Sequence, residues 1–204
     1  MKRYLLLYLL FTSLVAYAQE GTGHNNARHY LLADGAICML DGKIHEPLIS
    51  RLGPELGLGY RVDIPISSAW SIIPGAGVHT EVLGLFNYAA SEISIQSDVY
   101  CAAGYHFVVN EVNAVFSIGP NLSYFIHPTY YYIDSEPLDA RNGKEVYNRF
   151  NLSLRPEIMF QGSGHWNYGL GMNIGLLNQR KKYEEFATYN SRVHYLRFIV
   201  AYCL

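Results

Sequence analysis

The segment Leu52–Val62, LGPELGLGYRV, has the alternation that a membrane-spanning strand requires. Every second residue, starting with Leu52, is large and apolar or a proline, and the residues between them are small or charged. Because successive side chains of a strand point to opposite faces, one face of this strand is apolar and the other is not. Its length, 11 residues, matches the roughly 9 to 11 residues with which a tilted strand crosses a bilayer. The segment is therefore expected to lie against lipid on one face and against a barrel interior on the other.

Seven further stretches repeat this alternation, so the sequence predicts eight strands. They are expected at residues 28–40, 52–62, 70–82, 93–107, 114–126, 147–160, 166–176 and 192–204. The connections between them are alternately long and short, which is typical of outer-membrane barrels with short periplasmic turns and long outer loops. A closed barrel also leaves no strand edge unpaired in lipid. The predicted fold is all-β, an eight-stranded antiparallel transmembrane up-and-down β-barrel in a bacterial outer membrane, with both termini periplasmic.

The N-terminus indicates export. Lys2 and Arg3 precede the short apolar run Tyr4–Val15, and Ala16-Tyr17-Ala18 is a small-x-small cleavage site. This pattern predicts a signal peptide over residues 1–18; the alternative is an uncleaved membrane anchor, for which the run is short. Residues 19–27 are expected to form a flexible periplasmic leader, and residues 28–204 a single barrel domain.

The composition argues for a membrane protein and against several other classes. Charged residues make up 16% of the chain, against about 25% in typical soluble domains. The net charge of −2 does not suggest a nucleic-acid partner. Cys38, Cys101 and Cys203 are too scattered for a disulfide framework or a zinc site. They are interpreted as small apolar residues, and no metal or other cofactor is expected.

A soluble eight-stranded barrel is the main alternative fold, with its apolar face turned inward. The lysines speak against it, because Lys43, Lys144, Lys181 and Lys182 all fall in predicted loops and leave the strand faces without a lysine. Aromatic residues also gather at the predicted strand ends, as expected for the two interfaces of a membrane. At the short-turn ends they are Trp70, Tyr105, Phe107, Phe160, Trp166 and Tyr202, and at the outer ends Tyr124, Tyr147 and Phe150.

Two segments and the last strand resemble the PorT-like outer-membrane β-barrel family. The segments are Leu52–Val78, LGPELGLGYRVDIPISSAWSIIPGAGV, and Ser117–Ile126, SIGPNLSYFI. The resemblance extends over nearly all of the chain that follows the signal peptide. It implies an eight-stranded outer-membrane barrel and contributes no catalytic motif.

Four prolines fall inside the predicted strands, on the lipid-facing side: Pro54, Pro74, Pro120 and Pro156. A proline cannot donate a hydrogen bond to the neighbouring strand, and a closed barrel has no free edge to accommodate it. Each proline is therefore expected to mark a β-bulge.

The predicted interior contains many charged side chains. They are Glu55, Arg61, His79, Glu81, Asp98, His106, Arg155, Glu157 and Arg197. Buried charges need partners, so the favoured interpretation is a salt-bridge network that fills the lumen. A second interpretation is a lipid-hydrolysing site that joins a serine, a histidine and a carboxylate. Its members would be His79, Glu81 and either Ser94 or Ser123.

The outer loops contain two candidate contact segments. Three consecutive tyrosines, Tyr130, Tyr131 and Tyr132, fall in the longest predicted loop, residues 127–146. They are a candidate contact patch for a protein partner, because tyrosine anchors interfaces well; the alternative is that they pack on the barrel rim. Arg180–Lys182 is a candidate contact for lipopolysaccharide phosphates, although the glutamates that follow favour a solvated loop.

Three classes of function fit these observations. The favoured one is a non-enzymatic structural or binding barrel whose outer loops meet a partner, with the lipid bilayer and lipopolysaccharide around it. The second is an outer-membrane hydrolase or acyltransferase, which requires the His79 cluster to be in contact. The third is a small channel, which requires an open lumen.

Overall fold

The computed structural model describes residues 27–41, 52–83, 90–132, 139–142, 148–178 and 192–204. The predicted signal peptide and all but the last residue of the leader lie outside these ranges. So do the four lysines of the predicted loops and the segment Arg180–Lys182. No helix among the described residues is long and apolar enough to cross a membrane.

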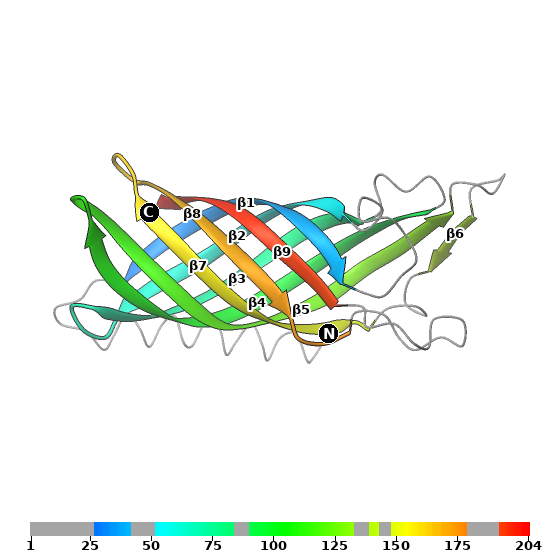
Figure 1. Ribbon diagram of the computed structural model, residues 1–204, viewed down its shortest axis with the longest axis horizontal. Helices are drawn as coiled ribbons and strands as arrows, with labels where there is room; N and C mark the ends of the chain where they lie inside the picture. Colours follow the sequence, from blue (N-terminus) through cyan, green and yellow to red (C-terminus); the bar gives the residue numbers. More distant parts are fainter. Residues whose placement is uncertain (1–26, 42–51, 84–89, 133–138, 143–147, 179–191) are drawn as a thin grey trace.

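The described chain forms nine strands (Figure 1). They are β1 (Arg28–Asp41), β2 (Leu52–Pro65), β3 (Trp70–Leu83), β4 (Ala90–Val109), β5 (Val112–Tyr132), β6 (Asp139–Asn142), β7 (Phe150–Gln161), β8 (Trp166–Gly175) and β9 (Arg192–Cys203). Eight of them pair antiparallel in the order β1-β2-β3-β4-β5-β7-β8-β9, and β9 pairs with β1 to close the ring. The predicted eight-stranded up-and-down barrel is thereby confirmed.

The two faces of the barrel have opposite character. Leu58 in the middle of β2 is 70% exposed, and Leu196 and Phe198 on β9 are exposed as well, whereas Arg197 between them is 2% exposed. Apolar side chains therefore point outward and polar side chains inward, the reverse of a soluble barrel. This is the arrangement that a bilayer requires of a spanning barrel.

Aromatic side chains gather near both ends of the barrel. At the short-turn end, Trp70 lies against Tyr105 and Trp166 against Tyr202, each pair with ring centroids 5.0 Å apart. At the other end, the rings of Tyr124 and Phe150 are also 5.0 Å apart. The two groups bracket the apolar outer surface, as the aromatic girdles of membrane barrels do.

The prediction of a bulge at each proline is wrong. Pro74 of β3 pairs with Cys101 of β4. On its other side, the ladder between β3 and β2 omits Pro74 and Ile73, and it resumes at Ile72 in the same register. Pro120 and Pro156 interrupt one ladder each in the same way, and Pro54 lies just past the last pair between β2 and β3. A proline removes a donor without adding a residue, so one ladder loses a bond and no register changes.

A register shift occurs elsewhere, where β4 and β5 leave the barrel. It lies between Ile95 and Gln96 on β4, which pair with His127 and Phe125 on β5, so that Ile126 is the additional residue. An additional residue of this kind bends a strand and increases its twist. The bend falls close to where β5 continues beyond β7, since the last pair between these two strands is Tyr124–Phe150.

The prediction of a loop over residues 127–146 is also wrong in part. Strand β5 continues to Tyr132, pairs with β4 as far as Ala90, and pairs with β6 on its other side. Tyr130, Tyr131 and Tyr132 therefore lie in an extension of β4, β5 and β6 that continues past the last pair between β5 and β7, as Figure 1 shows at the far end of β5. Consecutive tyrosines favour extended backbone, and the β4–β5 ladder offers them hydrogen bonds, so the strand does not stop at the barrel rim.

The outward position of Leu58 leads to a first prediction. Leu58→Arg places a charge near the middle of the apolar surface, where a lipid-facing arginine costs about 2 to 4 kcal/mol. We expect the midpoint of guanidinium unfolding in phospholipid vesicles to fall accordingly. Leu177→Arg is the control, because the exposed Leu177 follows the end of β8, where the cost is about 0 to 1 kcal/mol. Equal losses in the two variants would contradict the assignment of the lipid face.

Candidate functional site

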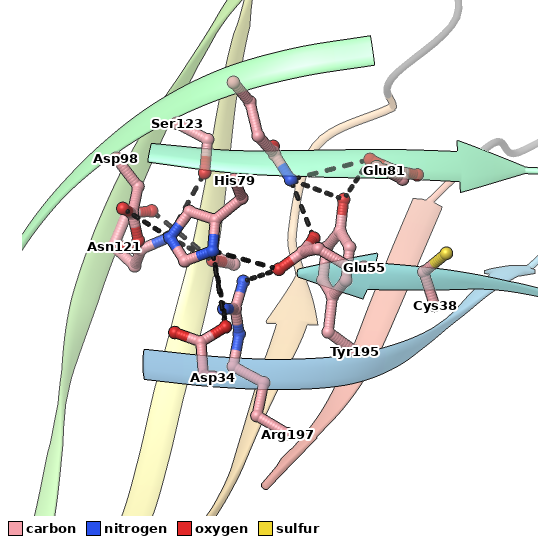
Figure 2. A network of polar contacts seen from close by, with 12 residues as sticks. Asp34, Cys38, Glu55, His79, Glu81, Asp98, Asn121, Ser123, Tyr195 and Arg197 are labelled. Atoms are coloured by element: carbon pink, nitrogen blue, oxygen red, sulfur yellow. Dashed lines mark hydrogen bonds and ion pairs between the residues drawn. The ribbon is translucent and has the colours of Figure 1, made fainter. Parts of the chain in front are cut away.

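The interior of the barrel is filled mainly by polar side chains that contact one another. The buried polar and charged residues are Asp34, Glu55, Arg61, Asp63, Ser71, His79, Glu81, Ser94, Gln96, Asp98, Ser117, Asn121, Ser123, Asn151, Ser153, Arg155, Glu157, Asn167, Asn173 and Arg197. They come from all eight barrel strands, because each strand turns every second residue inward. Figure 2 shows the half of this network around His79.

His79 of β3 is at the centre of the network. Its Nε2 atom lies 2.9 Å from Oδ1 of Asp98 on the adjacent strand β4. Its Nδ1 atom faces the opposite way, 3.4 Å from Oδ1 of Asp34 and 3.3 Å from Oε1 of Glu55. Three carboxylates from three other strands thus surround one imidazole (Figure 2).

Arg197 of β9 contacts the same groups from the other side. Its Nη1 atom lies 2.8 Å from Asp34 Oδ1 and 3.1 Å from His79 Nδ1, and its Nη2 atom lies 2.6 Å from Glu55 Oε1. Asp34, Glu55 and His79 form a set of the kind that binds metal ions, with candidate ligand atoms within 4.8 Å of one another. Since the guanidinium contacts all three residues, Arg197 acts as the internal cation of this set.

Glu81 is held by neutral donors next to this group. The Tyr195 hydroxyl donates to Glu81 Oε2 at 2.9 Å, and the Ser94 hydroxyl donates to the same oxygen at 3.4 Å. The Gln96 amide donates to Glu55 Oε2 at 2.9 Å and approaches Glu81 Oε2 at 3.5 Å. The neighbouring carboxylates of Glu55 and Glu81 are therefore linked through one side-chain amide.

The half of the network nearer the short turns contains two arginines. Arg155 contacts Asp98 Oδ2 at 3.4 Å and Glu157 Oε2 at 3.2 Å, and Arg61 forms an ion pair with Glu157. The Arg155 guanidinium also lies over the Tyr100 ring, 4.2 Å from its centroid. Because Asp98 binds both His79 and Arg155, it joins the two halves into one network.

The glycines of the inner face make room for these side chains. A Cβ atom on Gly57 would lie 2.0 Å from His79 Nδ1, and one on Gly75 would lie 2.3 Å from the Tyr100 ring. Both distances are too short for any real contact. The space that these glycines leave is therefore already occupied by the imidazole and the phenol ring, and it does not widen the lumen.

The seven residues expected in the lumen network are all buried, with 1–4% of each exposed. They are Glu55, Arg61, Glu81, Asp98, Arg155, Glu157 and Arg197. Six of them form ion pairs, and Glu81 accepts the hydrogen bonds described above. His106 lies apart from them near the short turns, where its Nε2 atom is 2.9 Å from Ser71 Oγ.

The members of the hydrolase interpretation do not come together as that chemistry requires. His79 pairs with Asp98 instead of Glu81, and the Ser94 hydroxyl donates to Glu81. The Ser123 hydroxyl accepts a hydrogen bond from Asn121 at 3.2 Å. In a triad the serine hydroxyl bonds to the histidine, so this geometry gives the hydrolase interpretation no support.

Three further residues of the interior were not recognised in the sequence. The pattern does not assign Asp34 to the inner face, because the nearby stretch Tyr30–Leu32 is apolar on both faces and obscures the alternation. The signal that identifies it is a lone carboxylate two residues from Leu32 and from Ala36, on the face that is buried. Asp63 falls in the predicted connection that follows residue 62, whereas in the structure β2 continues to Pro65. Tyr195 carries no signal beyond its place in the alternation of β9.

Comparisons with known proteins show a likeness to solved bacterial outer-membrane barrels. The attachment invasion locus protein Ail of Yersinia pestis is 9% identical, covers 87% of this chain and 97% of its own, and has a TM-score of 0.48. For the outer-membrane enzyme PagL these values are 9%, 83%, 98% and 0.47, and for neisserial surface protein A 10%, 87%, 98% and 0.45. No family model and no curated protein matches the sequence.

These solved structures include an outer-membrane enzyme, an attachment invasion locus protein and a surface protein. At such identities and TM-scores the likeness assigns no activity. The class of this protein follows from its own geometry: a closed eight-stranded barrel with an apolar exterior and a polar interior is an outer-membrane β-barrel.

The contacts of Arg197 lead to a second prediction. Arg197→Ala removes the cation that faces both Asp34 and Glu55, and breaking a buried ion pair on one side costs about 3 to 5 kcal/mol. We expect a fall of that size in the free energy of unfolding in phospholipid vesicles. The control is Arg192→Ala on the same strand, where the arginine is exposed and the change is within about 0.5 kcal/mol. A small loss with Arg197→Ala would show that the network does not stabilise the barrel.

Proposed function

We propose that the protein is a non-enzymatic outer-membrane barrel that has a structural or binding role and meets its partner through the outer loops. The resemblance to the PorT-like family belongs to this proposal. The observation that carries it is the filled lumen, to which all eight barrel strands contribute buried side chains and in which ion pairs and hydrogen bonds join many of these side chains. An interior occupied in this way leaves the two ends of the barrel as its surfaces for recognition.

The arrangement of the connections supports an orientation. Strand β1 begins and strand β9 ends at the side of the barrel that carries the connections after β2, β4 and β7, each of four residues or fewer. Outer-membrane barrels turn their short connections toward the periplasm. We therefore place both termini in the periplasm, and the longer connections outside, among lipopolysaccharide.

The extension of β4, β5 and β6 is the proposed contact surface. It carries Tyr130, Tyr131 and Tyr132 beyond the barrel end, on a paired strand. Tyrosine is enriched among the residues that dominate binding energies, and a paired strand holds its backbone in place before a partner arrives. The proposed partner of this contact patch is a protein.

The alternative function is a small channel, which would require an open lumen. An eight-stranded barrel is about as wide inside as its own side chains. In this barrel Tyr100, Phe125 and Met159 point inward and are buried, and ion pairs link the charged groups between them. These contacts favour a closed lumen.

A third prediction follows for conduction. In planar lipid bilayers we expect the wild-type protein to give no steady single-channel current, because side chains fill its interior. Current steps that change in size with Arg155→Ala and stay the same with Leu196→Ala would contradict the proposal. The first substitution alters the lumen, whereas the second alters only the exposed outer face.

A fourth prediction tests the contact patch. A photo-crosslinking amino acid at position 131 is expected to give a discrete protein adduct in intact outer membranes. The control is the same amino acid at position 168, where the exposed Tyr168 of β8 lies on the apolar outer surface. Identical products from the two positions would show that the extension has no partner of its own.

A further inference from the structure

A cavity of about 550 Å³ opens at the short-turn end of the barrel. Its wall includes Arg28, Tyr30, Arg61, Asp63, His106 and Met159. The volume lies within the range of roughly 300 to 1,000 Å³ that small-molecule sites occupy. The cavity is separate from the group around His79, and the function proposed above does not use it.

One side of the cavity is apolar. Tyr30 and Met159 line it, and both belong to a buried cluster with Leu32, Ile199 and Ala201, against which the partly buried Cys203 packs. The cavity therefore combines an apolar floor with a polar mouth, as sites for small organic molecules do.

Two buried polar residues of the cavity wall each have an atom without a hydrogen-bond partner in the described part of the chain. Arg61 is 4% exposed and Asp63 is 3% exposed, and these atoms are Nε of Arg61 and Oδ1 of Asp63. The imidazole of His106 approaches Asp63 Oδ1 only to 3.5 Å, which is longer than a normal hydrogen bond. Buried donors and acceptors in native proteins are nearly always paired, so the guanidinium of Arg61 and the carboxylate of Asp63 keep unused hydrogen-bonding capacity beside the cavity.

The mouth of the cavity also presents opposite charges side by side. Arg28 on β1 is the register partner of Asp63 on β2. No ion pair joins the two side chains in the part of the chain that the structure describes, and Arg28 is exposed. The same wall thus offers a cation and an anion that are available to a ligand carrying both charges.

We propose that this cavity binds a small zwitterion with a short apolar group, of the amino-acid or dipeptide class. The guanidinium groups of Arg28 and Arg61 bind the carboxylate, and the Asp63 carboxylate accepts hydrogen bonds from the ammonium group. The apolar group packs on Tyr30 and Met159. Under the orientation proposed above, the ligand enters from the periplasm.

The experiment is isothermal titration calorimetry on the full barrel in detergent micelles, with three matched probes. L-alanyl-L-alanine carries both charges, N-acetyl-L-alanyl-L-alanine lacks the ammonium group, and L-alanyl-L-alaninamide lacks the carboxylate. We expect saturable 1:1 binding of the first probe, and affinities about tenfold or more lower for the other two, because each loses a charged hydrogen-bonding group.

Two variants test which residue of the cavity wall binds each charge of the ligand. Asp63→Asn is expected to abolish the preference for the free dipeptide over its N-acetyl form, and Arg28→Gln to reduce the preference over the amide, because Arg61 still faces the carboxylate. Arg192→Gln is the control, because it removes an exposed arginine at the opposite end of the barrel. Arg28 is exposed, so Arg28→Gln supplies a folded variant if Asp63→Asn does not fold.

Three outcomes would overturn the proposal. The first is the lack of saturable binding of the free dipeptide at tens of millimolar. The second is equal affinity for the three probes, which would show that the charges of the wall do not select the ligand. The third is an equal effect of Arg192→Gln and Arg28→Gln, which would point to attraction by the overall charge of the protein.

Discussion

The pairing of the first strand with the last is the interaction on which the rest of the structure depends. Strand β1 pairs with β9 from Tyr30–Cys203 to Asp41–Arg192, in a continuous antiparallel register. Every other backbone ladder of the barrel joins two barrel strands that are successive along the chain. Without the β1–β9 ladder the sheet would expose two unpaired edges, and unpaired backbone groups in a bilayer cost several kcal/mol each. The same closure brings Asp34 and Arg197 together, although 163 positions separate them in sequence.

Closure at eight strands also determines the interior. The lumen is too narrow for bulk water to solvate charges, so each buried charge depends on side chains from other strands. Asp98 illustrates this dependence, because its single carboxylate contacts both His79 and Arg155. Glycines beside the bulky groups leave the space that these side chains occupy. The lumen is therefore a packed core built of polar groups, in which charged side chains contact side chains of other strands.

The two ends of the barrel carry different features, and the side chains that fill the lumen lie between them. One end extends into the paired strands of β4, β5 and β6, and three consecutive tyrosines lie on β5 there. The other ends in a cavity with an apolar floor and charges of both signs. The polar network lies between the two ends. We propose one end as a contact surface for a protein and the other as a site for a small molecule.

The sequence by itself determined the fold and the face of nearly every described residue. Alternation has a period of two residues and is local, so Leu58 and Arg197 can be assigned to lipid and lumen without knowing any partner. The same local signal failed at Tyr30–Leu32, where both faces are apolar, and at Tyr130–Tyr132, where the strand leaves the bilayer that imposes the pattern. Only the tertiary structure decided that Asp98 and not Glu81 pairs with His79, and that Asp63 faces a cavity. Those contacts depend on the stagger of eight strands around a closed ring, which no single segment of the chain encodes.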